Sequence, residues 1–257
     1  MTPSTSRKNK KNAFKSLLAV CVWVALWQIA SMAVGEEMLL ASPLSVGREL
    51  ASLVPTAAFW QSIGFSLSRM AAGFFAAFAI GLALAAAAYR LEGVDIFLRP
   101  VMAVIKAAPV ASYIIICLII MPVKSLSTII ALTMALPIIY SNVLEGLRST
   151  DQKLLQMAKA FEMSALRRVL YIYFPQLTPF LLTACSLALG LCWKAGIAAE
   201  VIGLPLGSIG EKLYQAKIFV DTKGVLAWTV VVIAISFAFE KVFVGALRRL
   251  ASRIGRR

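Results

Sequence analysis

The stretch Met70–Tyr89, MAAGFFAAFAIGLALAAAAY, contains no charged residue and is made largely of alanine, glycine and phenylalanine. A helix needs about 20 predominantly apolar residues to cross the hydrocarbon core of a bilayer. Because backbone amides in lipid must be satisfied within the segment, such a stretch is expected to be helical. Small residues let helices approach closely, so we predict a membrane-spanning helix packed inside a bundle.

Uncharged stretches of this kind recur along the chain. The others are Ser16–Gly35, Ala107–Val123, Ser125–Leu144, Val169–Trp193 and Val225–Phe239. In all, 60% of the 257 residues are hydrophobic and 15% are charged, whereas about a quarter are charged in soluble domains. We therefore predict an all-α integral membrane protein with six spans. Pro109 and Pro137 are expected to break or kink the third and fourth spans.

The formal charge of +14 is concentrated at the two ends of the chain. Basic residues before the first span and after the last are Arg7, Lys8, Lys10, Lys11, Lys15, Arg248, Arg249, Arg253, Arg256 and Arg257. The positive-inside rule then places both termini in the cytoplasm, and this distribution argues against nucleic-acid binding. We expect a basic N-terminus at residues 1–13, a six-helix transmembrane domain at 14–250 and a basic tail at 251–257.

Catalytic and metal chemistry are not indicated. The chain has no histidine, and Cys21, Cys117, Cys185 and Cys192 all lie in apolar stretches, where free cysteine behaves as a small hydrophobic residue. No Gly-x-x-x-x-Gly-Lys-[Ser/Thr] phosphate-binding loop occurs. We expect no metal, no cofactor and no ATP hydrolysis in this chain.

The connection at residues 145–175 is too polar to cross a membrane. Asp151 is expected to cap a helix over 152–161, whose apolar face carries Leu154, Met157, Ala158 and Phe161. Ser164 is expected to cap a second helix over 165–174, which Pro175 ends before a new span begins at Thr178-Pro179. Two short amphipathic helices fit equally well on a lipid surface or in the groove of a soluble partner.

The same connection resembles the signature loop of the membrane subunits of bacterial ATP-binding-cassette (ABC) importers. The family pattern is Glu-Ala-Ala, three residues, Gly, nine residues, then Ile-x-Leu-Pro. Here the frame falls on Gln156-Met157-Ala158, Glu162, Ile172 and Phe174-Pro175. Ala158, Ile172 and Pro175 match the pattern, while Gln156, Met157, Glu162 and Phe174 depart from it. Segments such as LLASPLSVGREL and FPQLTPFLLTACSLALGLCWKAGIAAEVIG are similar to the nitrate/sulfonate/taurine branch, over roughly 39–250.

This resemblance implies a type I importer permease in the bacterial cytoplasmic (inner) membrane, moving a small, anionic solute inward by alternating access. It implies a cytoplasmic ABC ATPase dimer that uses ATP, a second permease subunit that is a copy of this chain, and an extracytoplasmic substrate-binding protein. It names residues 145–175, here called the coupling segment, as the ATPase contact. Its candidate residues are Leu154, Gln156, Met157, Ala158, Phe161, Glu162, Ile172 and Pro175.

Ionisable residues inside apolar stretches are candidates for the solute pathway, because charge at membrane depth normally faces a cavity or a partner. Lys194 and Glu200 lie in the fifth span. We expect Lys194 to face the pathway and favour an anion; an ion pair with Glu200 or with another span is the competing interpretation. Arg69 and Lys106 lie near span ends, where their charges can reach the interface.

Two other functions fit parts of the sequence. An ion-coupled secondary transporter or channel would explain the spans and Lys194, but would leave the amphipathic helix pair without a role. A membrane anchor or assembly factor would use the helix pair and basic ends, without any solute pathway. Dependence of uptake on a separate ATPase distinguishes the three.

Overall fold

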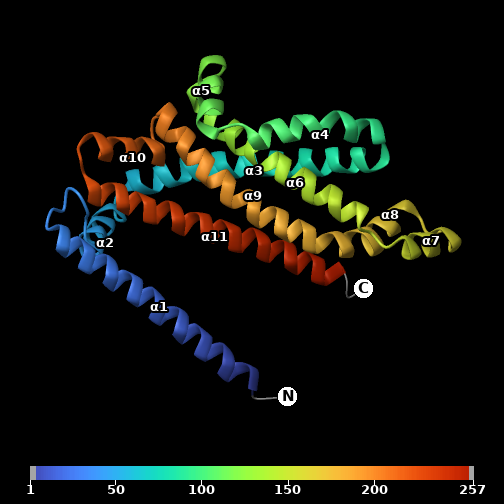
Figure 1. The fold of residues 1–257 in the computed structure, drawn as a ribbon, viewed down its shortest axis with the longest axis horizontal. Helices are drawn as coiled ribbons and strands as arrows, with labels where there is room; N and C mark the ends of the chain where they lie inside the picture. The colour runs from blue at the N-terminus through green and yellow to red at the C-terminus, as the bar shows by residue number, and fades with distance from the viewer. Residues whose placement is uncertain (1–3, 255–257) are drawn as a thin grey trace. The chain divides into compact units, whose positions relative to one another are not determined.

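The computed structural model describes residues 4–254, and the side chains from Leu18 onward together with Lys15. All elements in this part of the chain are helical (Figure 1). They are α1 (Ser4–Val34), α2 (Pro43–Leu53), α3 (Ala57–Arg90), α4 (Glu92–Ala107), α5 (Val110–Ile120), α6 (Val123–Arg148), α7 (Gln152–Ala160), α8 (Ala165–Arg168), the π-helical turn η1 (Val169–Tyr173), α9 (Phe174–Gly203), α10 (Ile209–Ile218) and α11 (Thr222–Ile254). The all-α prediction is confirmed.

Four helical stretches between residues 4 and 254 are long and apolar enough to cross a membrane: α3, α6, the run Ala165–Gly203, and α11. The pair α4 and α5 passes the same test together but is bent by 104°. Pro109 lies at this break, where the proline ring and missing N–H oppose helix continuation. The apolar part of α1, Leu18–Val34, is shorter. A multi-pass protein is supported, while the count of six and the orientation remain predictions.

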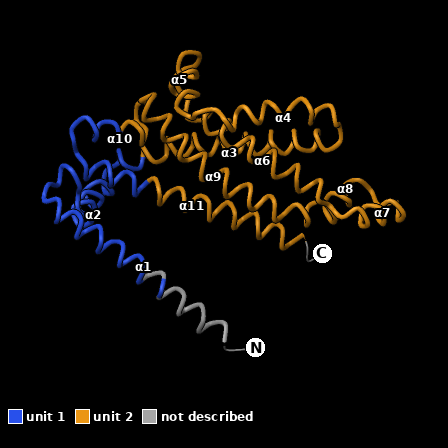
Figure 2. Tube along the Cα trace, in the orientation of Figure 1, with its two compact units in different colours: residues 1–60, 212–231 blue, residues 61–211, 232–257 orange. Residues whose placement is uncertain are grey.

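The chain divides into two compact units (Figure 2), and the domain limits expected at 14–250 stay a prediction. The first comprises Met1–Trp60 and Lys212–Val231. Within it, Trp27 Nε1 donates to the Ala41 carbonyl at 3.1 Å, and the Ser31 hydroxyl donates to the Leu40 carbonyl at 2.8 Å. These bonds hold the chain after α1 against that helix. The short helix α2 is capped by Ser42, whose side chain accepts a hydrogen bond from the Ser45 backbone N–H at 3.1 Å.

The second unit comprises Gln61–Glu211 and Val232–Arg257. In it α6 and α9 pack along each other over most of their lengths, and α3 lies against α6 (Figure 1). A Cβ at Gly73 would collide with the Thr128 carbonyl oxygen of α6, so only glycine permits this approach. Small residues therefore do bring α3 close to its neighbour. One face of α3 is buried, however, while side chains such as Phe75 and Ile80 are exposed in the single chain.

A cluster of aromatic rings joins α3, α9 and α11 within this second unit. The Phe74 ring lies 5.0 Å from that of Phe243 in an edge-to-face arrangement, and Trp193 lies 6.4 Å from Phe239. Edge-to-face pairs at such separations are favoured by the ring quadrupole. The cluster fixes the part of α9 that carries Lys194.

The junction between the coupling segment and the membrane differs from the expectation. We expected Pro175 to end one helix and Thr178 to cap the next, but α8, η1 and α9 form a continuous helical run, Ala165–Gly203. Proline lacks an N–H and its ring crowds the carbonyl four residues earlier. The wider π-helical turn at Val169–Tyr173 immediately precedes it and accommodates this defect without a break.

The basic ends lie partly outside the described residues. These are residues 1–3 and 255–257, together with the side chains of the N-terminal basic run up to Lys11. The assignments of 1–13 and 251–257 as cytoplasmic tails thus remain predictions.

Candidate functional site

The start of the coupling helix is fixed by a side-chain cap and by a contact with α9. Asp151 Oδ1 accepts from the Lys153 backbone N–H at 2.8 Å, as the sequence predicted. The Asp151 backbone N–H in turn donates to Gln176 Oε1 in the first turn of α9, at 2.9 Å. The first turn of α7 is therefore held to the helix to which the coupling segment returns.

The end of α7 is closed by a residue in the left-handed conformation. Glu162, at the position where the family pattern has glycine, has φ of +48°. The Met163 N–H donates to the Ala158 carbonyl at 2.9 Å and the Glu162 N–H to the Lys159 carbonyl at 3.1 Å. This is the Schellman pattern, which usually places glycine at this position. The substitution keeps the turn of the family loop while placing a side chain in a strained conformation.

The apolar face of α7 is divided between the protein interior and solvent. Phe161 is 80% exposed, Met157 48% and Leu154 37%, whereas Ala158 is only 2% exposed. Ala158, expected on the docking face with these three residues, is instead covered by its own unit, and its small side chain lets α7 rest there. We call Leu154, Met157 and Phe161 the coupling face.

The other predicted coupling residues also fall into two groups. Ile172 is 5% exposed and packs inward from η1, so it holds the segment rather than presenting a contact surface. Gln156, Glu162 and Pro175 are exposed. Ser164 precedes α8 with extended backbone, but its side chain makes no capping hydrogen bond.

A buried carboxylate anchors the helix that leads into the coupling segment. Asp95 lies in the first turn of α4, and its Oδ2 accepts hydrogen bonds from Arg99 at 2.7 Å and from Arg148 at 2.8 Å. The Tyr140 hydroxyl donates to Oδ1 at 3.2 Å. Hydrogen bonds from Arg148 and then Arg99 lower the pKa of the Asp95 carboxyl to about 2. Because Arg148 ends α6, this cluster fixes the point from which the coupling segment leaves.

Lys194 lies in a cavity of about 270 Å³ between α9 and the second-unit part of α11. The cavity is lined by Gly190, Trp193, Lys194, Val232, Ile233, Ser236, Phe237 and Glu240. Lys194 is exposed, and the Ser186 hydroxyl donates to Glu240 Oε1. The cavity thus brings one cation and one carboxyl to a largely apolar wall.

Glu200 does not join this cavity. Its side chain is fully buried, and Oε2 accepts from the Ser66 hydroxyl at 2.6 Å and from the Gly210 N–H at 3.3 Å. The Ile209 N–H completes the group by donating to Ser66 Oγ at 3.0 Å. In this structure Glu200 therefore ties the start of α10 to α9 and α3, and it forms no ion pair with Lys194.

The family's sequence profile, described as "Binding-protein-dependent transport system inner membrane component", matches residues 77–255. The match covers more than half of the chain and includes the coupling segment. The chain belongs to this family. It is a permease of the ABC importer class, in the nitrate/sulfonate/taurine branch, and a multi-pass component of the inner membrane.

Curated relatives extend the similarity beyond the profile. The putative aliphatic sulfonates transport permease protein SsuC of Bacillus subtilis is 25% identical over 91% of this chain and 85% of its own length. The taurine transport system permease protein TauC of Escherichia coli is 26% identical over 89% and 84%. The nitrate import permease protein NrtB of Synechocystis is 27% identical over 75% and 72%. The resemblance seen in the sequence is thereby confirmed.

Two polar residues of this permease were missed in the sequence. Asp95 lies in a short connection among several arginines, and only the return of α6 reveals which of them it binds. Glu240 follows the uncharged stretch Val225–Phe239 directly, and α11 continues for another 14 residues to Ile254. The available signal was an acid directly after the uncharged stretch of the expected sixth span.

Proposed function

We propose that this permease is driven by a separate ABC ATPase that docks on the coupling face. The observation that carries the proposal is the exposure of Leu154, Met157 and Phe161 on a short helix whose two ends are fixed by its own protein. Large apolar side chains on a rigid amphipathic helix are suited to a hydrophobic groove on a partner. ATP binding and hydrolysis are then the work of that partner.

For movements of the ATPase to reach the membrane-spanning helices, the coupling segment must be held to those helices by direct contacts. Asp95 with Arg148 supports the end of α6, and Asp151 with Gln176 supports the start of α9. A displacement of α7 is thus transmitted to α6 and α9, which pack along each other. We infer that this connection converts ATPase closure into alternating access.

For the solute, we propose a small anion that interacts with Lys194. The relatives are named for sulfonates, taurine, nitrate and bicarbonate, which supports an anionic or zwitterionic substrate. A lysine in a cavity among apolar side chains favours negative charge. A second copy of the chain and an extracytoplasmic binding protein complete the proposed importer.

The docking proposal is tested with Phe161→Asp in the chain produced together with its cognate ATPase. Loss of a large, exposed aromatic anchor is expected to weaken ATPase binding by about thirtyfold or more. Leu206→Asp is the matched control, because Leu206 is 81% exposed but lies in the loop after α9. ATPase binding that is equal in both variants would contradict the proposal.

The solute proposal is tested by uptake in proteoliposomes containing the assembled importer. Lys194→Met is expected to lower uptake of the anion about tenfold, whereas Lys194→Arg keeps the charge and most of the activity. ATPase binding should be unchanged in both variants. Full uptake by Lys194→Met would remove Lys194 from the pathway, and uptake driven by an ion gradient without ATPase would favour the secondary-transporter alternative.

A further inference from the structure

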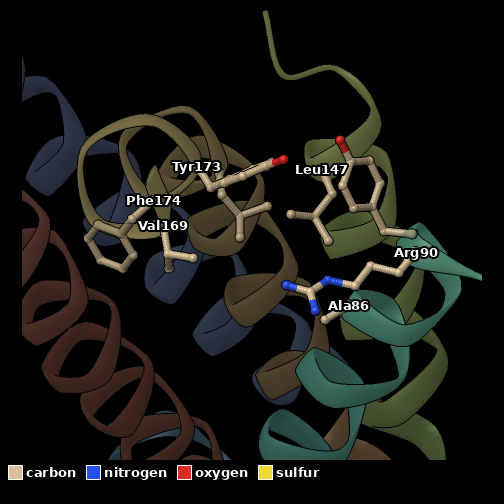
Figure 3. A pocket seen from close by; sticks show the side chains of 8 residues that line it. Ala86, Arg90, Leu147, Val169, Tyr173 and Phe174 are labelled. Atoms are coloured by element: carbon tan, nitrogen blue, oxygen red, sulfur yellow. The ribbon is translucent and has the colours of Figure 1, made fainter. Parts of the chain in front are cut away.

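A second cavity, of about 210 Å³, lies at the root of the coupling segment (Figure 3). Its wall is contributed by α3, α6, η1 and the start of α9. Most of the lining side chains are apolar: Ala86, Leu147, Val169, Phe174 and Leu177. The polar ones are Tyr89, Arg90 and Tyr173. The cavity is amphiphilic, with an apolar wall and a cationic, phenolic rim.

Arg90 brings a positive charge to this cavity, and none of the described residues pairs with it. It is the last residue of the apolar helix α3, and its side chain forms no ion pair or hydrogen bond with any described residue. Figure 3 shows its guanidinium beside Ala86, reaching in among the apolar side chains. None of the described residues that line the cavity is acidic, so a ligand is the available source of negative charge for the exposed Arg90.

Two further polar features lie near this cavity. Arg168 precedes the lining residue Val169 but does not itself line the cavity, and its buried Nε finds no acceptor in the part of the chain that the structure describes. The rings of Tyr89 and Tyr173 meet edge to face at 6.0 Å, which places two phenol groups at the rim. Arginine and tyrosine are the residues that gather at membrane interfaces around lipid headgroups.

We propose that this cavity binds the headgroup of an anionic phospholipid. The phosphate accepts hydrogen bonds from Arg90, and an acyl chain covers the apolar wall of Ala86, Leu147 and Val169. A free phosphate would satisfy the arginine but would leave that wall uncovered, whereas a phospholipid satisfies both. The end of α3 at Arg90 is where its apolar run stops, which is the depth at which headgroups lie.

The bound lipid joins η1 and α9 on one side to α3 and α6 on the other. It therefore steadies the helices that carry the coupling segment, and it makes ATPase coupling sensitive to the anionic lipid content of the membrane. This consequence rests on the proposed function; the binding itself does not.

Binding is measured on the purified, delipidated full-length chain in detergent, without ATPase or solute, by titration with phosphatidylglycerol. Losing one arginine–phosphate contact weakens lipid binding about fivefold, so Arg90→Gln is expected to raise the Kd by that factor. Ala86→Phe keeps every charge but fills the cavity, and it is expected to lower binding at least as much. Arg249→Gln is the matched control, because Arg249 is exposed near the end of α11 and outside the cavity.

Phosphatidylcholine and glycerol 3-phosphate serve as the comparison ligands, and both are expected to bind at least about tenfold more weakly than phosphatidylglycerol. Wild-type affinity in both Arg90→Gln and Ala86→Phe would overturn the site. Equal affinity for glycerol 3-phosphate would overturn the lipid assignment in favour of a free phosphate. Because no ATPase is present, none of these results depends on the docking proposal.

Discussion

Two regions, the helix α7 before α9 and the last turn of α9 itself, depart in opposite ways from the rule that apolar groups are buried and charged groups are exposed. The helix α7 presents Met157 and Phe161 to solvent. In the last turn of α9, Glu200 is fully buried with Ser66 and the Gly210 backbone as partners. In a segment too polar to cross the membrane, exposed apolar side chains indicate a surface for another protein. A buried carboxyl with partners from its own chain indicates a structural role, so the two exceptions predict different experimental signatures.

The largest effect on stability is expected at Glu200. Glu200→Ala removes the acceptor for the Ser66 hydroxyl and the Gly210 N–H and leaves both buried, which costs about 3 kcal/mol in the free energy of unfolding. Denaturant unfolding in detergent measures it. Glu37→Ala, an exposed control, should change stability by less than about 0.5 kcal/mol. Equal stability of the two variants would mean that the buried network is not structural.

Asp95 should have the next largest effect. Asp95→Asn weakens its bonds to Arg99 and Arg148; because both arginines are partly exposed, we expect a loss of about 1.5 kcal/mol. Glu92→Gln, in the same turn but exposed, serves as the control.

The pH dependence of the Asp95 effect has a definite sign. The pKa of Asp95 is lowered from 3.8 to about 2 in the folded protein, so its stabilisation is present above pH 3.8 and is lost as the pH falls through 2. The difference in the free energy of unfolding between wild type and Asp95→Asn should be constant near neutral pH. It should fall towards zero in that acidic window. A difference that instead grows below pH 4 would contradict this assignment.

The smallest effect on stability is expected at the residues that follow the C-terminal ends of α7 and α9. Glu162 after α7 and Leu204 after α9 both adopt left-handed backbone conformations, with φ of +48° and +54°. Glycine avoids the strain of a Cβ there, so Glu162→Gly and Leu204→Gly should each stabilise the protein by about 1 kcal/mol. ATPase affinity should be unchanged in Leu204→Gly. Destabilisation by both substitutions, measured by the same denaturant titration, would show that the side chains matter more than the backbone.

Local features of this fold were predictable from the sequence. Asp151 caps α7 and Pro109 breaks the span between α4 and α5, because both effects depend on neighbouring residues alone. The left-handed turn at Glu162 could be anticipated only through the family pattern, since glutamate itself does not favour it.

Features set by distant contacts were not predictable. Helical periodicity placed Ala158 on the same face as Phe161, but it could not show that Ala158 would be covered by its own unit. The π-helical turn before Pro175 and the bond between Asp95 and Arg148 likewise depend on helices far apart in sequence. In the candidate pathway, Glu200 was placed with Lys194 on composition, whereas packing buries it with Ser66.

Site-specific photo-crosslinking in the assembled importer measures which partner the coupling face contacts. A crosslinking amino acid placed singly at Phe161 or Met157 is expected to form an adduct with the ATPase. The same probe at Leu206, which is equally exposed beyond the other end of α9, is expected to form none. ATPase adducts from Leu206 but not from Phe161 or Met157, in an importer that remains active, would contradict the assignment of α7 as the ATPase contact.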